Sequence, residues 1–185
     1  MRIDPILEAL SKLPPREGAY VVAIDGRAAS GKTTLAQHLK ELLGAEVIHM
    51  DDFFLPPMLR TEERLRQAGG NVHYERFAEE VLLQIRQTDA FSYRRFDCGK
   101  MELDGKREVK EAKIRVVEGA YSHHPYFGEY ADLKVFSDVE YAEQLRRIRE
   151  RNGDTKLETF KNRWIPLEEA YFSAYTVREN ADIII

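Results

Sequence analysis

The sequence predicts an α/β domain in which a five-stranded, mostly parallel sheet carries helices on both faces. Two features predict this fold class. Short apolar runs rich in β-branched residues recur along the chain, and segments with apolar residues at helical spacing separate them. Buried strands that alternate with helices are typical of a parallel sheet covered on both sides. The length of 185 residues, with 43% apolar and 32% charged side chains, fits one domain of ordinary size.

The individual elements follow from the period of the apolar positions. We expect buried strands at residues 19–25, 46–50, 114–119, 131–138 and 181–185. We expect helices at residues 3–13, 33–44, 60–70, 74–87, 139–153 and 155–175. The stretches 90–97 and 106–119 hold strand-like segments, and Asp104-Gly105 predicts the turn between them. Residues 52–110 are therefore expected to form an insertion within a single domain spanning 1–185.

Charge and cysteine content exclude several classes of protein. A net charge of −4, from 28 basic and 32 acidic residues, gives no support for a broad nucleic-acid-binding face. Cys98 is the one cysteine, so an intrachain disulfide is excluded and a reducing, cytoplasmic compartment is favoured. The N-terminal segment carries acidic residues, unlike a signal peptide, and no apolar run approaches the ~20 residues that cross a membrane.

Residues 26–33, "GRAASGKT", match the P-loop (Walker A) pattern G-x-x-x-x-G-K-[ST]. A predicted strand precedes the motif and a predicted helix follows it, which is the context that the pattern requires. Glycines let several backbone N–H groups converge on one anion, and the helix start adds the positive end of its dipole. The motif predicts a three-layer P-loop NTPase fold. The expected nucleotide-binding residues are Gly26, Ala28, Ala29, Ser30, Gly31, Lys32, Thr33 and Thr34.

Two acidic residues follow strands of the predicted sheet. Asp51 comes directly after the strand at 46–50, and Glu118 comes directly after the apolar run "IRVV". In open α/β sheets, ligands bind beyond the carboxyl ends of the strands. We therefore expect both carboxylates to face the phosphate cleft. The alternatives are a helix or turn cap for Asp51 and a strand-end carboxylate paired with a lysine for Glu118.

Five segments, taken in order, resemble the uridine kinase family: "AIDGRAASGKTTLA", "MDDFF", "VVEG", "QLRRIRERNG" and "ADIII". That family belongs to a wider set of P-loop kinases that includes pantothenate kinase and phosphoribulokinase. The resemblance spans residues 19–185, and the P-loop is its most specific segment. It implies a kinase that uses Mg²⁺ and transfers the γ-phosphate of ATP to a hydroxyl of a nucleoside-like small molecule.

The resemblance also implies roles for single residues of the phosphate cleft. Asp51 stands where the family has the base that receives the proton of the acceptor hydroxyl. An ordinary carboxylate suffices there, because phosphoryl transfer is mostly positioning and charge neutralisation. Glu118 matches an acid near Mg²⁺, so Thr33, Glu118 and Asp51 form the implied metal-facing set. Lys32 holds the phosphates, whereas Asp52 replaces a serine of the family and is expected to be local scaffolding.

The segment "LRRIRERNG" offers two outward-facing arginine pairs on its predicted helix, Arg146 with Arg149 and Arg147 with Arg151. In the family, the corresponding segment leads into a lid whose arginines meet the transferring phosphates. The resemblance therefore implies a lid at about 146–165, with Arg146 and Arg149 as catalytic residues and Arg151 on the substrate. A solvated helix face paired with neighbouring glutamates is the alternative.

The acceptor side departs from the family pattern at three positions. Phe96 stands where the family has tyrosine, beside the retained Asp97. Phe54 lacks an expected hydroxyl, and His73 replaces an acid that grips the ribose hydroxyls. We expect these four residues to contact the acceptor. Because lost hydrogen-bonding partners can cost orders of magnitude for a substrate, a different acceptor such as pantothenate, a ribosylated vitamin or a sugar acid stays open.

The expected partner is thus a small-molecule phosphate acceptor, with no nucleic acid and no membrane. Self-association into a homo-oligomer is left open. A nucleotide-dependent switch without kinase activity is the alternative from a different functional class. The chain lacks a guanine-reading N/T-K-x-D sequence, which disfavours that alternative.

Overall fold

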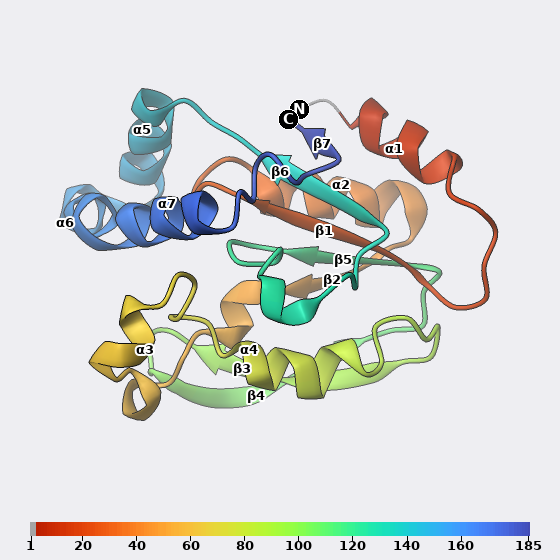
Figure 1. Ribbon diagram of the computed structural model, residues 1–185, viewed down its shortest axis with the longest axis horizontal. Helices are drawn as coiled ribbons and strands as arrows, with labels where there is room; N and C mark the ends of the chain where they lie inside the picture. Colours follow the sequence, from red (N-terminus) through yellow and green to blue (C-terminus); the bar gives the residue numbers. More distant parts are fainter. Residues whose placement is uncertain (1–2) are drawn as a thin grey trace.

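Five parallel strands form the central sheet of the computed structural model, which describes residues 3–185. The strands stand in the order β2-β5-β1-β6-β7, and all registered pairs are parallel (Figure 1). Their bounds are Tyr20–Gly26 for β1, Glu46–His49 for β2, Ile114–Glu118 for β5, Leu133–Ser137 for β6 and Ile183–Ile184 for β7. The predicted sheet is confirmed, and each strand lies within two residues of its expected start.

The sheet has an apolar core on each face, because successive side chains of a strand point to opposite sides. On one face, Val22 and Ile24 pack in a core with residues of helices α1 (Asp4–Ser11) and α2 (Lys32–Leu43). On the other face, Val21 and Ala23 pack in a core with residues of the insertion and of the C-terminal helix α7 (Ile165–Ala174). These four side chains of β1 are fully buried. The predicted three-layer arrangement is therefore confirmed.

The insertion between β2 and β5 holds short helices and a β-hairpin. Its elements are η1 (Met50–Phe53), η2 (Pro57–Leu59), α3 (Glu62–Arg66), α4 (Tyr74–Phe77), the π-helix η3 (Ala78–Leu82), β3 (Phe91–Asp97) and β4 (Glu102–Val109). The ring of Phe53 lies 5.1 Å from those of Phe77 and Tyr93, centroid to centroid. This aromatic cluster belongs to the core under the sheet, so it fixes η1 and the hairpin to the strand ends.

The pair Asp104-Gly105 forms a β-bulge, and the turn predicted at this position is wrong. Both residues lie within β4, where they face the single residue Arg95 of β3. Gly105 has φ +77°, and a left-handed glycine is what one common type of bulge requires. The hairpin instead turns at residues 98–101. An Asp-Gly pair indicates left-handed backbone, which turns and bulges both use, and only the strand register decides between them.

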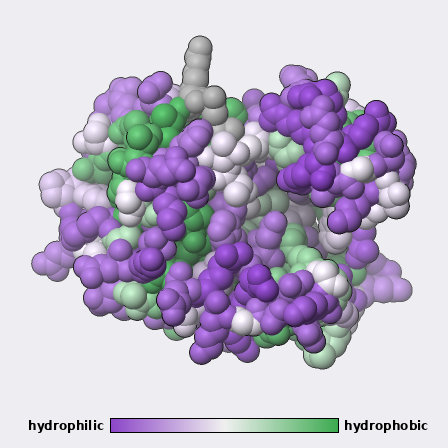
Figure 2. Space-filling view, turned by 180° about the vertical axis from the view of Figure 1, so that it is seen from behind, coloured by the Kyte–Doolittle hydropathy of each residue, from purple (hydrophilic) through white to green (hydrophobic). Residues whose placement is uncertain are grey.

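Helices α5–α7 form a lobe at the carboxyl-terminal side of the sheet (Figure 1). The lobe comprises α5 (Tyr141–Asn152), α6 (Asp154–Thr159), the π-helix η5 (Phe160–Trp164) and α7 (Ile165–Ala174). Figure 2 shows the molecule hollowed between this lobe, whose outer surface is mostly hydrophilic, and the body of the domain. A short helix η4 (Pro125–Phe127) lies in the segment after β5. Among the helices of residues 3–185, none combines the length and apolar character needed to span a membrane.

Candidate active site

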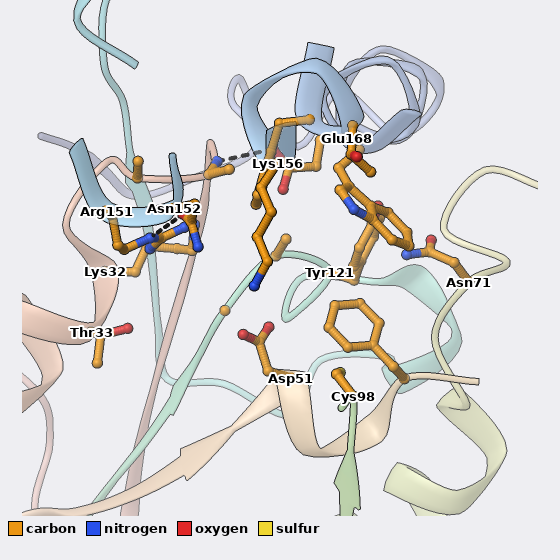
Figure 3. A pocket seen from close by; sticks show the side chains of 18 of the residues that line it. Lys32, Thr33, Asp51, Asn71, Cys98, Tyr121, Arg151, Asn152, Lys156 and Glu168 are labelled. Atoms are coloured by element: carbon orange, nitrogen blue, oxygen red, sulfur yellow. Dashed lines mark hydrogen bonds between the residues drawn. The ribbon is translucent and has the colours of Figure 1, made fainter. Parts of the chain in front are cut away.

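A cavity of about 780 Å³ lies at the carboxyl ends of β1, β2 and β5. Its walls come from the P-loop, η1, the turn of the hairpin, the segment after β5 and the α5–α7 lobe. Figure 3 shows Asp51 near the centre of the cavity, with Lys32 and Thr33 on one side and Asn71 and Tyr121 on the other. The cavity thus joins the P-loop to the strand-end acids, as the parallel topology predicts.

The P-loop joins β1 to α2, which confirms the predicted strand, loop and helix. Gly26 has φ +135°, and a Cβ atom there would lie 2.0 Å from the carbonyl oxygen of Ser137 in β6, so only glycine fits. The Nζ atom of Lys32 donates to the carbonyl oxygens of Gly26 and Arg27, both at 2.7 Å. Six of the eight predicted nucleotide-binding residues line the cavity: Ala28, Ala29, Gly31, Lys32, Thr33 and Thr34. The other two, Gly26 and Ser30, are buried.

Side chains from the α5–α7 lobe support the P-loop from outside. The buried carboxylate of Glu168 accepts the N–H of Ala28 at 2.9 Å. Gln144 donates to the carbonyl oxygen of Ala28 at 3.1 Å, and Arg147 donates to that of Ala29 at 3.2 Å. Sequence reasoning did not find Glu168 or Gln144, because helical spacing alone does not say which loop a helix face will meet.

Glu118 connects the P-loop to β2 through its two carboxylate oxygens. Thr33 donates its hydroxyl to Oε2 of Glu118 at 3.1 Å, and His49 Nδ1 lies 2.6 Å from Oε1. Glu118 is 6% exposed, whereas Thr33 is open to the cavity. The structure therefore brings together two of the three predicted metal-facing residues. The partner of Glu118 on β2 is a histidine, not the lysine of the alternative interpretation.

Asp51 lies in η1 with its carboxylate in the cavity. Solvent reaches it through the cavity, but protein encloses it on the other sides. This enclosure is the main cause that raises the pKa of Asp51, and the negative charge of Glu118 adds to it. The positive charge of Lys32 opposes the rise. Its neighbour Asp52 points away from the cavity, accepts the hydroxyl of Tyr93 at 3.0 Å and is 4% exposed, which agrees with the expected scaffolding role.

The lid arginines are distributed differently from the prediction. Arg147 and Arg151 line the cavity. Arg146 instead binds Glu143 and Glu150 on the outer face of α5, and Arg149 pairs with Asp154 at 2.9 Å. The expectation that Arg146 and Arg149 face the phosphates is therefore wrong in this structure. Both helix faces carry an arginine pair, so the sequence alone did not decide which one turns inward.

Besides Arg151, four residues are predicted to contact the acceptor, and of these only Phe54 lines the cavity. The ring of Phe54 lies 6.3 Å from that of Trp164, centroid to centroid. His73 caps α4 by accepting the N–H of Arg76, and Phe96 is buried in the hairpin at 3% exposure. Asp97 accepts two N–H groups of the hairpin turn. The acceptor assignments of His73, Phe96 and Asp97 are corrected accordingly.

Several cavity residues carried no signal in the sequence. Cys98 and Met101 enter from the hairpin turn, Asn71 from the loop before α4, and Lys156 from α6. Figure 3 shows the side chain of Lys156 directed toward Asp51. No local motif marks these positions, because each one reaches the cavity only through the packing of the insertion or of the lobe.

Comparison with known proteins agrees with this geometry. No protein-family model matches the chain. A curated uridine kinase from Chlamydia pneumoniae is 24% identical in an alignment that covers 89% of this chain and 80% of that protein. A possible uridine kinase from Bacillus stearothermophilus has a TM-score of 0.74 at 21% identity, covering 99% of this chain and 96% of that one.

A candidate fructose transport system kinase from a Silicibacter species has a TM-score of 0.78 at 23% identity, covering 100% of this chain and 99% of that one. The chain has the fold of the uridine kinase-like P-loop kinases. The predicted resemblance to the uridine kinase family is thereby confirmed. D-glycerate 3-kinase from Cryptococcus neoformans shares the fold more distantly, with a TM-score of 0.54 at 15% identity over 91% of this chain and 84% of that one.

The buried carboxyl of Glu168 leads to a pH-dependent prediction. Burial raises its pKa from 4.5 to about 7. Between pH 4.5 and pH 7, the carboxyl of Glu168 has lost its proton in the unfolded chain but keeps it in the folded protein. The free energy of unfolding therefore falls as pH rises from 4.5 to 7, by about 1.4 kcal/mol per pKa unit. We expect the free energy of unfolding to fall less between pH 5 and pH 8 in Glu168→Gln than in the wild type, as measured by urea unfolding at the two pH values.

The exposed Glu158, which pairs with Lys161, provides the control for this measurement. The Glu158→Gln variant should keep the pH dependence of the wild type. An equal pH dependence in the wild type and in Glu168→Gln would contradict the raised pKa of Glu168.

Proposed function

We propose that this protein is an ATP-dependent kinase that phosphorylates a hydroxyl group of a small molecule. The observation that carries the proposal is the convergence of Lys32, Thr33, Asp51, Arg147 and Arg151 on one cavity. Phosphoryl transfer needs a phosphate cradle, positive charge near the transferred group, and a residue that orients the acceptor hydroxyl. The residues that line the cavity are chemically suited to all three roles.

In the proposed reaction, the acceptor hydroxyl oxygen bonds to the γ-phosphorus of ATP while the bond from that phosphorus to the β,γ-bridging oxygen breaks. ADP leaves, and the hydroxyl proton passes to Asp51. The raised pKa of Asp51 makes its carboxylate a better proton acceptor than an ordinary aspartate. Lys32 would exchange its contacts with the loop carbonyls for the outer phosphates. Arg147 and Arg151 would face the transferred group from the lobe.

Thr33 and Glu118 are the residues that would hold Mg²⁺ beside the phosphates. Their oxygens lie 3.1 Å apart, and residues 3–185 contain no group of three or more His, Cys, Asp or Glu side chains suited to a metal ion. This small donor set fits Mg²⁺, which takes one or two protein oxygens together with phosphates and waters. When bound, the ion supplies neutralisation of the phosphate charge.

Relatives of the proposed kinase are named for different acceptors. The curated relative is a uridine kinase, while structural neighbours are named for fructose transport and for D-glycerate. Two residues that the uridine kinase pattern places at the nucleoside, Phe96 and Asp97, are engaged within the hairpin. This placement favours the alternative of a different acceptor. A coupled ADP-release screen over nucleosides, vitamins, sugars and sugar acids tests the proposal, and slow hydrolysis that no compound stimulates would instead support a nucleotide switch.

Replacing the proposed base gives a direct test of its role. We expect Asp51→Asn to lower turnover by roughly 10²–10⁴, which corresponds to about 3–5 kcal/mol. Binding of Mg·ATP, measured by calorimetry, should change little. The melting temperature should not fall, because the change removes a negative charge that lies close to Glu118. Near-normal turnover would exclude Asp51 as the base.

The two faces of α5 give a matched pair of variants. Arg151→Ala should lower turnover by roughly 10²-fold, the effect expected when one donor to the transition state is lost. Arg146→Ala should stay within about twofold, because its exposed ion pairs with Glu143 and Glu150 contribute little. Steady-state kinetics of the two variants decides the assignment. A larger loss of turnover in Arg146→Ala than in Arg151→Ala would instead support Arg146 as the catalytic arginine, as the sequence predicts.

A further inference from the structure

Arg60 is a cation of the cavity wall for which residues 3–185 supply no carboxylate partner. It follows η2, it is half-buried, and it lines the cavity. Its Nε atom donates to the carbonyl oxygen of Leu55 at 2.7 Å, which fixes the plane of the guanidinium. Within residues 3–185, neither of its two Nη groups makes a hydrogen bond. Four N–H donors of a positioned guanidinium are therefore left for a ligand.

The lack of a partner distinguishes Arg60 from the rest of the insertion. Each of the seven other arginines between residues 52 and 110 has a carboxylate oxygen within 4.0 Å. Arg64, for example, binds both carboxylate oxygens of Glu75, at 2.6 and 2.9 Å. The chain carries 32 acidic and 28 basic residues, so acids are available for pairing. An unpaired, half-buried guanidinium in such a chain points to an anion from outside.

A second cation, Arg163, lies near Arg60. Partial burial and the neighbouring Arg163 lower the pKa of the Arg60 guanidinium. Arg163 itself stacks on Trp164, 4.7 Å from the ring, and has no carboxylate partner among the described residues. Trp164 lines the cavity. The wall near Arg60 is therefore electropositive and partly apolar.

A second polar group on the same wall lacks a partner. Asn71 is 6% exposed and lines the cavity; its Nδ2 donor lies near the hydroxyl of Tyr121 but has no partner with hydrogen-bond geometry within the described part of the chain. Figure 3 shows its amide directed into the cavity. The backbone of Leu55 connects the two donors, because its carbonyl accepts from Arg60 and its N–H donates to the carbonyl of Asn71 at 2.9 Å. Arg60 and Asn71, which both contact the backbone of Leu55, thus form a donor pair on this wall.

This donor pair lies on the acceptor side of Asp51. The thiol of Cys98 lies beside Asp51 (Figure 3). Burial raises the pKa of that thiol, the charge of Asp51 adds to the rise, and the charge of Arg60 opposes it. Both charged groups are therefore close to Cys98. Phe54 and Trp164, with ring centroids 6.3 Å apart, line the same part of the cavity. The space next to the proposed base is bounded by aromatic rings and by two unsatisfied donor groups.

We propose that the phosphate acceptor is a small hydroxylated anion, whose carboxylate or phosphate group binds Arg60 and Asn71 while its hydroxyl faces Asp51. The proposal rests on the kinase function inferred above and defines its substrate class. A guanidinium binds either anion through two parallel hydrogen bonds. A neutral polyol or nucleoside would leave the guanidinium without a counter-charge, so the site discriminates against it.

Matched pairs of acceptors test the proposal by ADP release. Glycerate and gluconate represent carboxylates, glycerol 3-phosphate and glucose 6-phosphate represent phosphates, and glycerol, glucose and uridine are the neutral counterparts. We expect kcat/KM to be at least roughly 10²-fold higher for members of one anionic class than for their neutral partners. The carboxylate and phosphate arms show which anion the site takes. Equal or higher values for the neutral compounds would overturn the proposal.

Variants of Arg60 separate recognition from folding. Arg60→Gln should remove the preference for anions by raising KM, and Arg60→Lys should restore part of it. The control is Arg66→Gln, since Arg66 lies exposed on α3 and pairs with the exposed Glu62. Melting temperatures confirm that each variant is folded. A preference for anions that survives in Arg60→Gln would overturn the assignment.

Alkylation of Cys98 measures acceptor binding without turnover, because it is the one cysteine of the chain and is exposed. With Mg²⁺ and a slowly hydrolysed ATP analogue present, anionic compounds should slow its reaction with iodoacetamide several-fold, and neutral compounds should not. If no compound stimulates ADP release but anions still protect Cys98 in the wild type and not in Arg60→Gln, the kinase function fails and the anion site stands. If no anion protects Cys98, the anion site is overturned.

Discussion

The buried carboxylate of Asp25 holds together the three segments that build the cavity. It is fully buried at the end of β1 and accepts the N–H groups of Gly26, Tyr121 and His123 at 2.7, 3.2 and 2.9 Å. It also accepts the hydroxyl of Tyr171 from α7 at 2.9 Å. Four donors offset the desolvation of this charge. The P-loop, the segment after β5 and the lobe helix therefore take fixed positions around one point.

The charges around the cavity follow from this arrangement. Asp51 and Glu118 stand at the strand ends, while Lys32, Arg151 and Lys156 face them from the P-loop and the lobe. An enclosed space with cations on several sides suits a polyphosphate and its metal ion, because opposite charges interact more strongly away from bulk water. The same enclosure raises the pKa of Asp51. The proposed phosphate binding and the proposed proton acceptance would thus both follow from one geometry.

Sequence reasoning succeeded where function depends on local structure and failed where it depends on packing. The P-loop and Asp51 could be predicted because a motif and a strand end fix their positions in the chain. Arg146 and Arg147 both fit an outward helix face, and only the docking of α5 on the P-loop decides which of them meets the cavity. Phe96 occupies the position of a family tyrosine that contacts the nucleoside, but the packing of the hairpin buries its ring away from the cavity. Glu168 lies far from the P-loop in sequence, so no pattern connected the two.

The central claim is that the cavity transfers a phosphoryl group from ATP to a hydroxyl instead of to water. ³¹P nuclear magnetic resonance of the reaction, run with an acceptor that stimulates ADP release, tests it most directly. We predict a new phosphomonoester signal that grows in step with ADP, with little inorganic phosphate. ADP accompanied only by inorganic phosphate would contradict the account.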